Sequence, residues 1–72
     1  MSVATAKVKL TTASRDLRIR WDEATQKWND PASRAIEKNH LQPFEARVRS
    51  ALNALDTIQD VLRIMQRDCG DD

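Results

Sequence analysis

The sequence predicts an all-α fold: an antiparallel two-helix hairpin with a long second helix, assembling into a four-helix bundle or a coiled-coil-like oligomer. Three observations predict it. The 72-residue chain has one Gly, two Pro and no Tyr, a composition typical of helices rather than sheets. Apolar residues recur at alternating spacings of three and four in two stretches, on either side of Asn29-Asp30-Pro31. The second stretch is much longer than the first, so part of its apolar side has no counterpart within the chain.

The first 13 residues are expected to form a basic, partly ordered N-terminal arm (residues 1–13). Residues 1–20 carry five Lys and Arg side chains against one Asp, and a solvated basic arm is the simplest interpretation. The first helix is predicted over residues 14–28, with an extension back toward Val8 left open. Its apolar seam has a heptad spacing with one polar member and consists of Leu10, Ser14, Leu17, Trp21, Ala24 and Trp28.

A tight turn at residues 29–30 follows the first helix. Asn29 favours a turn conformation, Asp30 can cap the next helix, and Pro31 suits the first helical position. So short a link makes the two helices fold back antiparallel. Trp28 is expected to pack at this closed end against the Ala and Ile side chains just after the turn. The alternative is an exposed Trp that recognises a partner.

The second helix is predicted over residues 31–69, and residues 70–72 form an acidic tail. The seam of this helix is spaced three and four throughout and consists of Leu41, Phe44, Val48, Ala51, Leu55, Ile58, Leu62, Met65 and Cys69. Upstream of Leu41 a shorter apolar stripe is offset from this seam by one position, and Pro43 lies at the offset. We expect one continuous helix with a kink near Pro43. The alternative is a short helix over residues 31–41, followed by a new helix that begins at Pro43.

The two seams predict a hairpin core and an oligomer interface. The expected hairpin core consists of Leu17, Trp21, Trp28, Ile36, Leu41, Phe44 and Val48. At about 1.5 Å of rise per residue the second helix outruns the first, so its far end lacks cover within the chain. The expected oligomer interface consists of Leu55, Ile58, Val61, Leu62 and Met65. Its partner is a second copy of the chain or a second small helical protein, and the pattern does not separate the two.

The sequence contains no constellation of catalytic, metal-binding or cofactor-binding residues. His40 lacks a neighbouring nucleophile, and Cys69 follows Asp68 near the acidic tail, where a thiolate is disfavoured. We therefore expect no enzymatic activity, metal, cofactor or small-molecule substrate. No apolar run reaches the ~20 residues of a membrane span, and no signal-peptide pattern is present. These features predict a cytoplasmic protein, or one secreted without a cleaved signal peptide.

Nucleic-acid binding, as a small dimeric helical regulator, is the alternative function. Arg15, Arg18 and Arg20 could contact phosphates, together with Lys7 and Lys9. The net charge is only +1, however, and acidic residues are interleaved with the arginines of the second helix. No aromatic side chain is left over for base stacking. The sequence therefore favours protein–protein interaction over nucleic-acid binding.

At the turn the sequence resembles the WXG family, the small helical hairpins exported by bacterial type VII secretion systems. The family's signature is Trp-X-Gly between two helices, with a large apolar residue about eight positions after the Trp. Here Trp28-Asn29-Asp30 stands at the turn and Ile36 follows at the matching position. The chain departs from the family in three respects: Asp30 replaces the Gly, the sequence is shorter than typical members, and Pro43 interrupts the second helix. The tyrosine of the family's export signal is also absent. The resemblance implies a non-enzymatic, dimeric four-helix assembly that serves as a secreted carrier, an adaptor or a structural protein.

Overall fold

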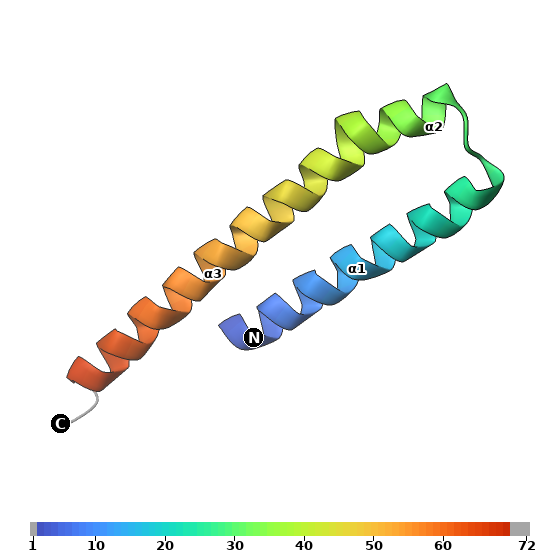
Figure 1. Ribbon diagram of the computed structural model, residues 1–72. Coiled ribbons are helices and arrows are strands. Elements are labelled where there is room, and N and C mark those ends of the chain that lie inside the picture. Colours follow the sequence, from blue (N-terminus) through green and yellow to red (C-terminus); the bar gives the residue numbers. More distant parts are fainter. Residues whose placement is uncertain (1, 70–72) are drawn as a thin grey trace.

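The computed structural model describes residues 2–69 and is helical along almost all of this range (Figure 1). Helix α1 spans Val3–Lys27, α2 spans Pro31–Ile36, the π-helical segment η1 spans Glu37–Leu41, and α3 spans Gln42–Cys69. The predicted all-α class, with a second helical arm longer than the first, is confirmed, and no strand occurs within residues 2–69. The predicted acidic tail at residues 70–72 lies outside the described range.

Helix α1 begins well before its predicted start. Ser2 caps it, because the Ser2 Oγ accepts a hydrogen bond from the backbone N–H of Thr5 at 3.1 Å. Residues 3–13, predicted as a partly ordered arm, are therefore part of the helix. Packing explains the difference: Leu10 and Thr11 are half-buried, and tertiary contact outweighs the weak helix propensity of threonine.

The turn between the two arms is held by two sets of hydrogen bonds. Trp28 ends α1, and its backbone N–H donates to the C=O of Ala24 at 3.1 Å. Asp30 and Ser33 then form a capping box: the Ser33 N–H donates to Asp30 Oδ1 at 2.8 Å, and the Asp30 N–H donates to Ser33 Oγ at 3.0 Å. Pro31 occupies the first turn of α2, where its missing N–H leaves no helical bond unmade.

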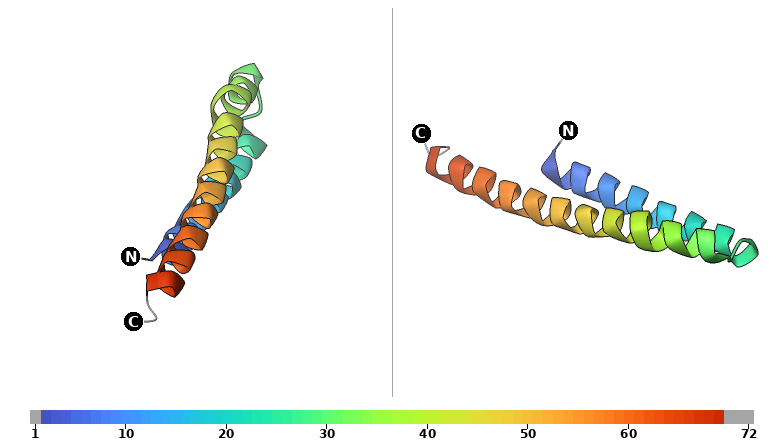
Figure 2. Two further views of the ribbon diagram at one scale, coloured as in Figure 1. Left: turned by 90° about the vertical axis from the view of Figure 1, so that its left-hand side faces the viewer. Right: turned by 90° about the horizontal axis from the view of Figure 1, so that it is seen from above.

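Helices α1 and α3 lie side by side and run in opposite directions, as all three ribbon views show (Figures 1 and 2). The chain is correspondingly elongated, with principal extents of 62 × 17 × 11 Å. The N-terminal part of α1 is tied to the middle of α3, where Lys7 forms an ion pair with Asp56 and donates a hydrogen bond to Gln59 Oε1 at 3.3 Å. The first residues of α1 reach further along α3, since Ser2, Val3 and Ala4 line one hollow together with Leu62 and Gln66. The C-terminal end of α3 continues past the start of α1 (Figure 1).

The helical path from Pro31 to Cys69 is continuous and passes through a π-helical turn just before Pro43. In this turn the N–H of Gln42 donates to the C=O of Glu37, five residues back. A π turn contains one residue more than an α turn. The extra residue accounts for the one-position offset in the sequence between the stripe before Leu41 and the seam after it.

The core between α1 and α3 is small and differs from the predicted one. Only Leu41 and Val48 are buried apolar residues within the described range, at 8% and 7% exposure, and Trp21 is half-buried. Four other residues of the predicted core are exposed: Leu17, Trp28, Ile36 and Phe44. The reason is geometric, because two packed helices touch along one line. On α3 this contact line passes through residues next to Phe44 and leaves the Phe44 side chain outside the contact. The half-buried or buried positions of α3 are Glu45, Val48, Leu52, Leu55 and Gln59.

Candidate interaction surfaces

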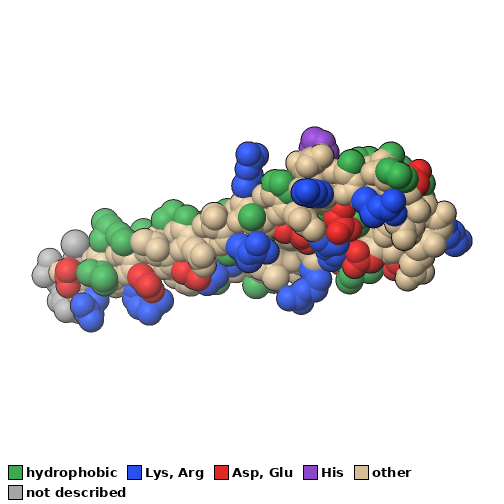
Figure 3. Space-filling view, turned by 45° about the horizontal axis from the view of Figure 1, so that its top comes forward, with side chains coloured by type: hydrophobic (Ala, Val, Ile, Leu, Met, Phe, Trp, Pro, Cys, Tyr) green, Lys and Arg blue, Asp and Glu red, His purple; other side chains and the backbone are tan. Residues whose placement is uncertain are grey.

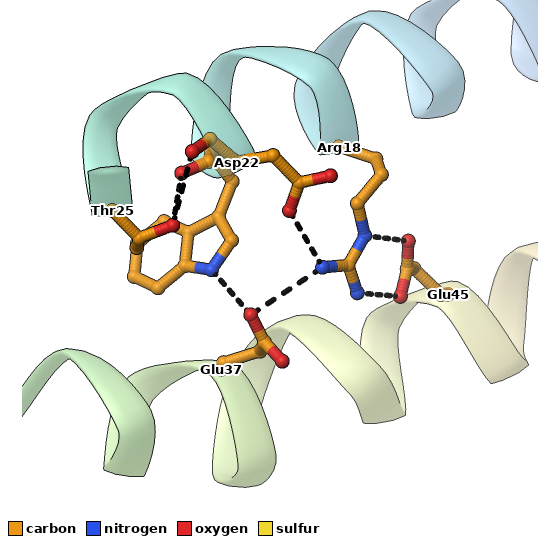
Figure 4. Close-up of polar contacts among 6 residues, drawn as sticks. Arg18, Asp22, Thr25, Glu37 and Glu45 are labelled. Atoms are coloured by element: carbon orange, nitrogen blue, oxygen red, sulfur yellow. Dashed lines mark hydrogen bonds and ion pairs between the residues drawn. The ribbon is translucent and has the colours of Figure 1, made fainter. Parts of the chain in front are cut away.

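The contact between α1 and α2–α3 is organised around one arginine (Figure 4). The Arg18 guanidinium donates two hydrogen bonds to Glu45, from Nε to Oε2 at 2.9 Å and from Nη2 to Oε1 at 2.5 Å. Its Nη1 lies 3.2 Å from Asp22 Oδ1 and 3.4 Å from Glu37 Oε1. The indole Nε1–H of Trp21 donates to the same Glu37 oxygen at 2.8 Å. One guanidinium therefore links three carboxylates on both arms of the chain.

This network changes the acidity of its members. Hydrogen bonding to Glu45 raises the pKa of Arg18 above its ordinary value, and the bonds from Arg18 lower the pKa of Glu45. Both groups therefore stay ionised at neutral pH, and the bidentate geometry is the strong form of an arginine–carboxylate pair. The apolar periodicity did not predict the contact line that contains Arg18 and Glu45. A row in which charged residues alternate with apolar ones gives only a weak periodic signal. The complementary charges of Arg18 and Glu45, on opposite sides of the turn, were the available signal.

Trp28 packs on Trp21 next to the turn. The two rings meet edge to face, with centroids 6.1 Å apart and an interplanar angle of 73°. The Trp28 Nε1–H donates to Asp30 Oδ2 at 2.9 Å, and the Trp28 side chain remains 41% exposed. Hydrogen bonds to Asp30, chiefly from the backbone N–H of Ser33, lower the pKa of its carboxyl group.

Exposed apolar side chains form a row along α3, one residue before the positions that contact α1. Phe44, Ala51, Ile58 and Met65 recur every seven residues, a step that keeps helical residues on nearly one side. On α1, Leu17 stands in the same relation to Arg18. Because the two helices are antiparallel, a residue that precedes a contact position lies on the same side of the pair on either helix. Leu17 therefore lies on the same side as the row on α3.

We call this side the apolar face. It is defined by Leu17, Phe44, Ala51, Ile58, Val61, Leu62 and Met65. Figure 3 shows hydrophobic side chains along one edge of the C-terminal half of α3 and charged side chains along the other. Ile58, Val61, Leu62 and Met65 are 43–54% exposed. These four belong to the predicted oligomer interface. The fifth predicted member, Leu55, is half-buried in the single chain.

The remaining sequence candidates are isolated from one another. His40 is exposed, and the side chain of Cys69 lies outside the described part of the structure. Among the described residues, no group of three or more His, Cys, Asp or Glu side chains could hold a metal ion. None of the helices in the described range is long and apolar enough to cross a membrane.

The cations considered for nucleic-acid binding are partly engaged within the chain. Arg18 is held by three carboxylates, and Lys7 by Asp56. A phosphate at either site would compete with these carboxylates and be repelled by them, which weakens the case for a nucleic-acid surface.

Compared with models of known protein families, with curated proteins and with solved structures, the chain matches none. The candidate surfaces are therefore interpreted from their own geometry.

Proposed function

We propose that this protein is non-enzymatic and acts by protein–protein association through its apolar face. The observation that carries the proposal is the row of exposed apolar side chains on α3, which continues past the end of α1. An apolar row of this length on one side of a small protein is typical of an interface. Fully burying a side chain such as Ile58, Leu62 or Met65 would contribute roughly 1.5–3 kcal/mol relative to leaving it exposed.

We further propose that the partner is a second copy of the chain, laid antiparallel to form a four-helix bundle. In this arrangement Phe44 faces Met65 of the other copy and Ala51 faces Ile58, since both pairs are centred on the same point of α3. Phe44 and Met65 then pair two large side chains, and the small Ala51 leaves room for the larger Ile58. The overhanging end of each α3 also comes to lie on the closed end of the other copy, so neither overhang stays uncovered.

Such an assembly suits a carrier, an adaptor or a structural protein, the roles that the WXG resemblance implies. The position of Trp28 directly before the turn and of Ile36 on the following helical arm supports this comparison. Two long antiparallel helical arms joined by a short turn, with one apolar face, are typical of a subunit of a helical bundle. Export from the cell is part of this proposal, with retention in the cytoplasm as its alternative.

The test is the mass in solution of three proteins, measured by light scattering and analytical ultracentrifugation. The wild-type chain should have about twice the 8.2 kDa mass of one chain. Leu62→Asp should be monomeric, because a carboxylate would enter the apolar contact. The matched control is Ile64→Asp, which carries the same charge at a residue of similar exposure, 49% against 43%, on the other side of α3.

The control should remain dimeric. A wild-type chain that is monomeric at every concentration would overturn the proposed self-association, and equal dissociation by both substitutions would overturn the assignment to the apolar face.

A further inference from the structure

A second surface lies between α1 and α3 on the side opposite the apolar face. It is a groove of about 300 Å³. Its lining comes from both helices and consists of Thr11, Ser14, Arg15, Arg18, Ile19, Glu45, Val48, Arg49 and Leu52. Arg15 and Arg49 lie on the charged sides of their helices, away from the row of Leu17 and Phe44. A dimer formed through the apolar face would leave this groove open to solvent.

The groove has a surplus of positive charge. Its lining contains three arginines and one carboxylate, Glu45. Both oxygens of Glu45 accept hydrogen bonds from Arg18. Within residues 2–69, neither Arg15 nor Arg49 takes part in an ion pair or a side-chain hydrogen bond. Two guanidinium groups on opposite helices therefore remain available to a ligand that carries negative charge.

The floor of the groove is apolar. Val48 is buried and Leu52 is half-buried, while Ile19 on α1 is 49% exposed at its rim. An apolar floor with a guanidinium on each helix suits a ligand that combines carboxylates with an aliphatic side chain. It suits nucleic acid less well, because the groove has no aromatic side chain on which a base could stack.

We propose that this groove binds an acidic peptide segment of a partner protein. The segment brings carboxylates to Arg15 and Arg49 and places a Leu or Ile side chain against Ile19 and Leu52. Charge complementarity selects the segment, and burial of its aliphatic side chain adds affinity. Because this groove and the apolar face lie on opposite sides, a dimer would present two such grooves.

The test uses three probes with isotope-labelled wild-type protein in NMR titrations. The first is a short synthetic peptide with Glu and Leu at helical spacing, the second has Lys at each Glu position, and the third is a short oligothymidine. The acidic peptide should shift the resonances of Arg15, Ile19, Arg49 and Leu52, and the basic peptide should shift none. Stronger binding of the oligothymidine at the same residues would overturn the proposal in favour of a phosphate site.

Substitutions separate the groove from general electrostatic attraction. Arg15→Gln and Arg49→Gln should each weaken the acidic peptide about tenfold, the effect of losing one charge-assisted hydrogen-bonded contact. Arg47→Gln is the matched control, because Arg47 is an exposed arginine two residues from Arg49 on α3 but outside the groove. Equal weakening by all three would overturn the proposal, as would the absence of any shift. The dimer mass is measured separately, so failure here is distinguishable from failure of the apolar-face proposal.

Discussion

The guanidinium of Arg18 on α1 and the carboxylate of Glu45 on α3 form a bidentate pair across the two helical arms (Figure 4). The side chains of the pair are only 30% and 22% exposed. With just Leu41 and Val48 as buried apolar residues in the described range, this pair is a large part of what fixes α1 against α3. It also fixes the register, because a shift of either helix by one turn would separate the two groups.

Breaking the pair should therefore destabilise the chain. Arg18→Met and Glu45→Gln should each lower the free energy of unfolding by about 1–3 kcal/mol. The first leaves the Glu45 carboxylate without its partner, and the second replaces a bidentate ion pair with at most one hydrogen bond to a neutral amide oxygen. The double variant should recover part of the loss, with a coupling energy of about 1 kcal/mol. Urea denaturation followed by circular dichroism measures all three values.

The exposed pair of Arg63 and Asp60 provides the control for this cycle. Its side chains are 71% and 65% exposed, so solvent screening should reduce its coupling below about 0.5 kcal/mol. Equal coupling in the two cycles would show that the Arg18–Glu45 pair is as screened in solution as a surface pair.

Stability should fall in acid because the pKa of Glu45 is lower in the folded chain than its ordinary value of 4.5. The folded chain then binds the proton less tightly than the unfolded chain, so protonation favours unfolding. The contribution of Glu45 is complete above its ordinary pKa and is lost as pH falls through the lower folded-state pKa. Asp30, whose pKa is also lowered, acts in the same direction.

The measurement is the urea midpoint at pH 7, 5 and 3.5. The midpoint should change little between the first two values and fall at the third. In Glu45→Gln the fall should be smaller, because that variant lacks the titrating carboxylate. An identical fall in the variant would assign the acid sensitivity to other carboxylates.

Trp28→Ala should lower the free energy of unfolding by about 1–2 kcal/mol. Truncation of a fully buried Trp costs ~3–5 kcal/mol, but Trp28 is 41% exposed and makes an edge contact with Trp21. Trp28→Phe should retain most of the stability, because it keeps a ring against Trp21 and loses only the hydrogen bond to Asp30. A loss above about 3 kcal/mol for the alanine variant would show that assembly buries Trp28 in solution.

The sequence predicted the helical class and the longer second arm because both depend on local signals. The spacing from Leu41 to Met65 is periodic over many turns, and Asn29-Asp30-Pro31 combines turn and cap residues. The predicted start of the first helix at residue 14 is too late, because the threonines at positions 11 and 12 have weak helix propensity whereas Thr11 is half-buried in the folded chain. Local propensity carries no information about such burial.

The choice of seam could not be made from periodicity alone. The apolar stripe of α3 is wide enough for either the row of Phe44 or the row of Leu52 to face α1. The packing of Arg18 against Glu45 decides between them, and it turns Phe44 outward. The pattern of apolar residues predicts that either row of α3 could pack against α1. The pairing of charges across the turn determines that the row of Leu52 does so.

The π turn allows a sharper test of how the two arms are aligned. Its extra residue keeps Ser33 and Glu37 on the side that faces α1, together with Leu41 and Glu45. Deleting Asn39 would remove that residue and leave an α-helix with the same faces aligned. Pro43 would then lie inside a regular α-helix, where its ring clashes with the preceding turn at a cost of about 3 kcal/mol.

Deletion of Asn39 alone should therefore destabilise the chain by about that amount, and adding Pro43→Ala should restore most of the loss. The control is deletion of Asn53 from the regular part of α3. That deletion rotates everything after it by roughly 100° relative to α1 and should not be rescued by Pro43→Ala. Thermal melts followed by circular dichroism distinguish these outcomes. If the Asn39 deletion is not rescued, the π turn does more than realign the two faces, and its own backbone geometry is required for the fold.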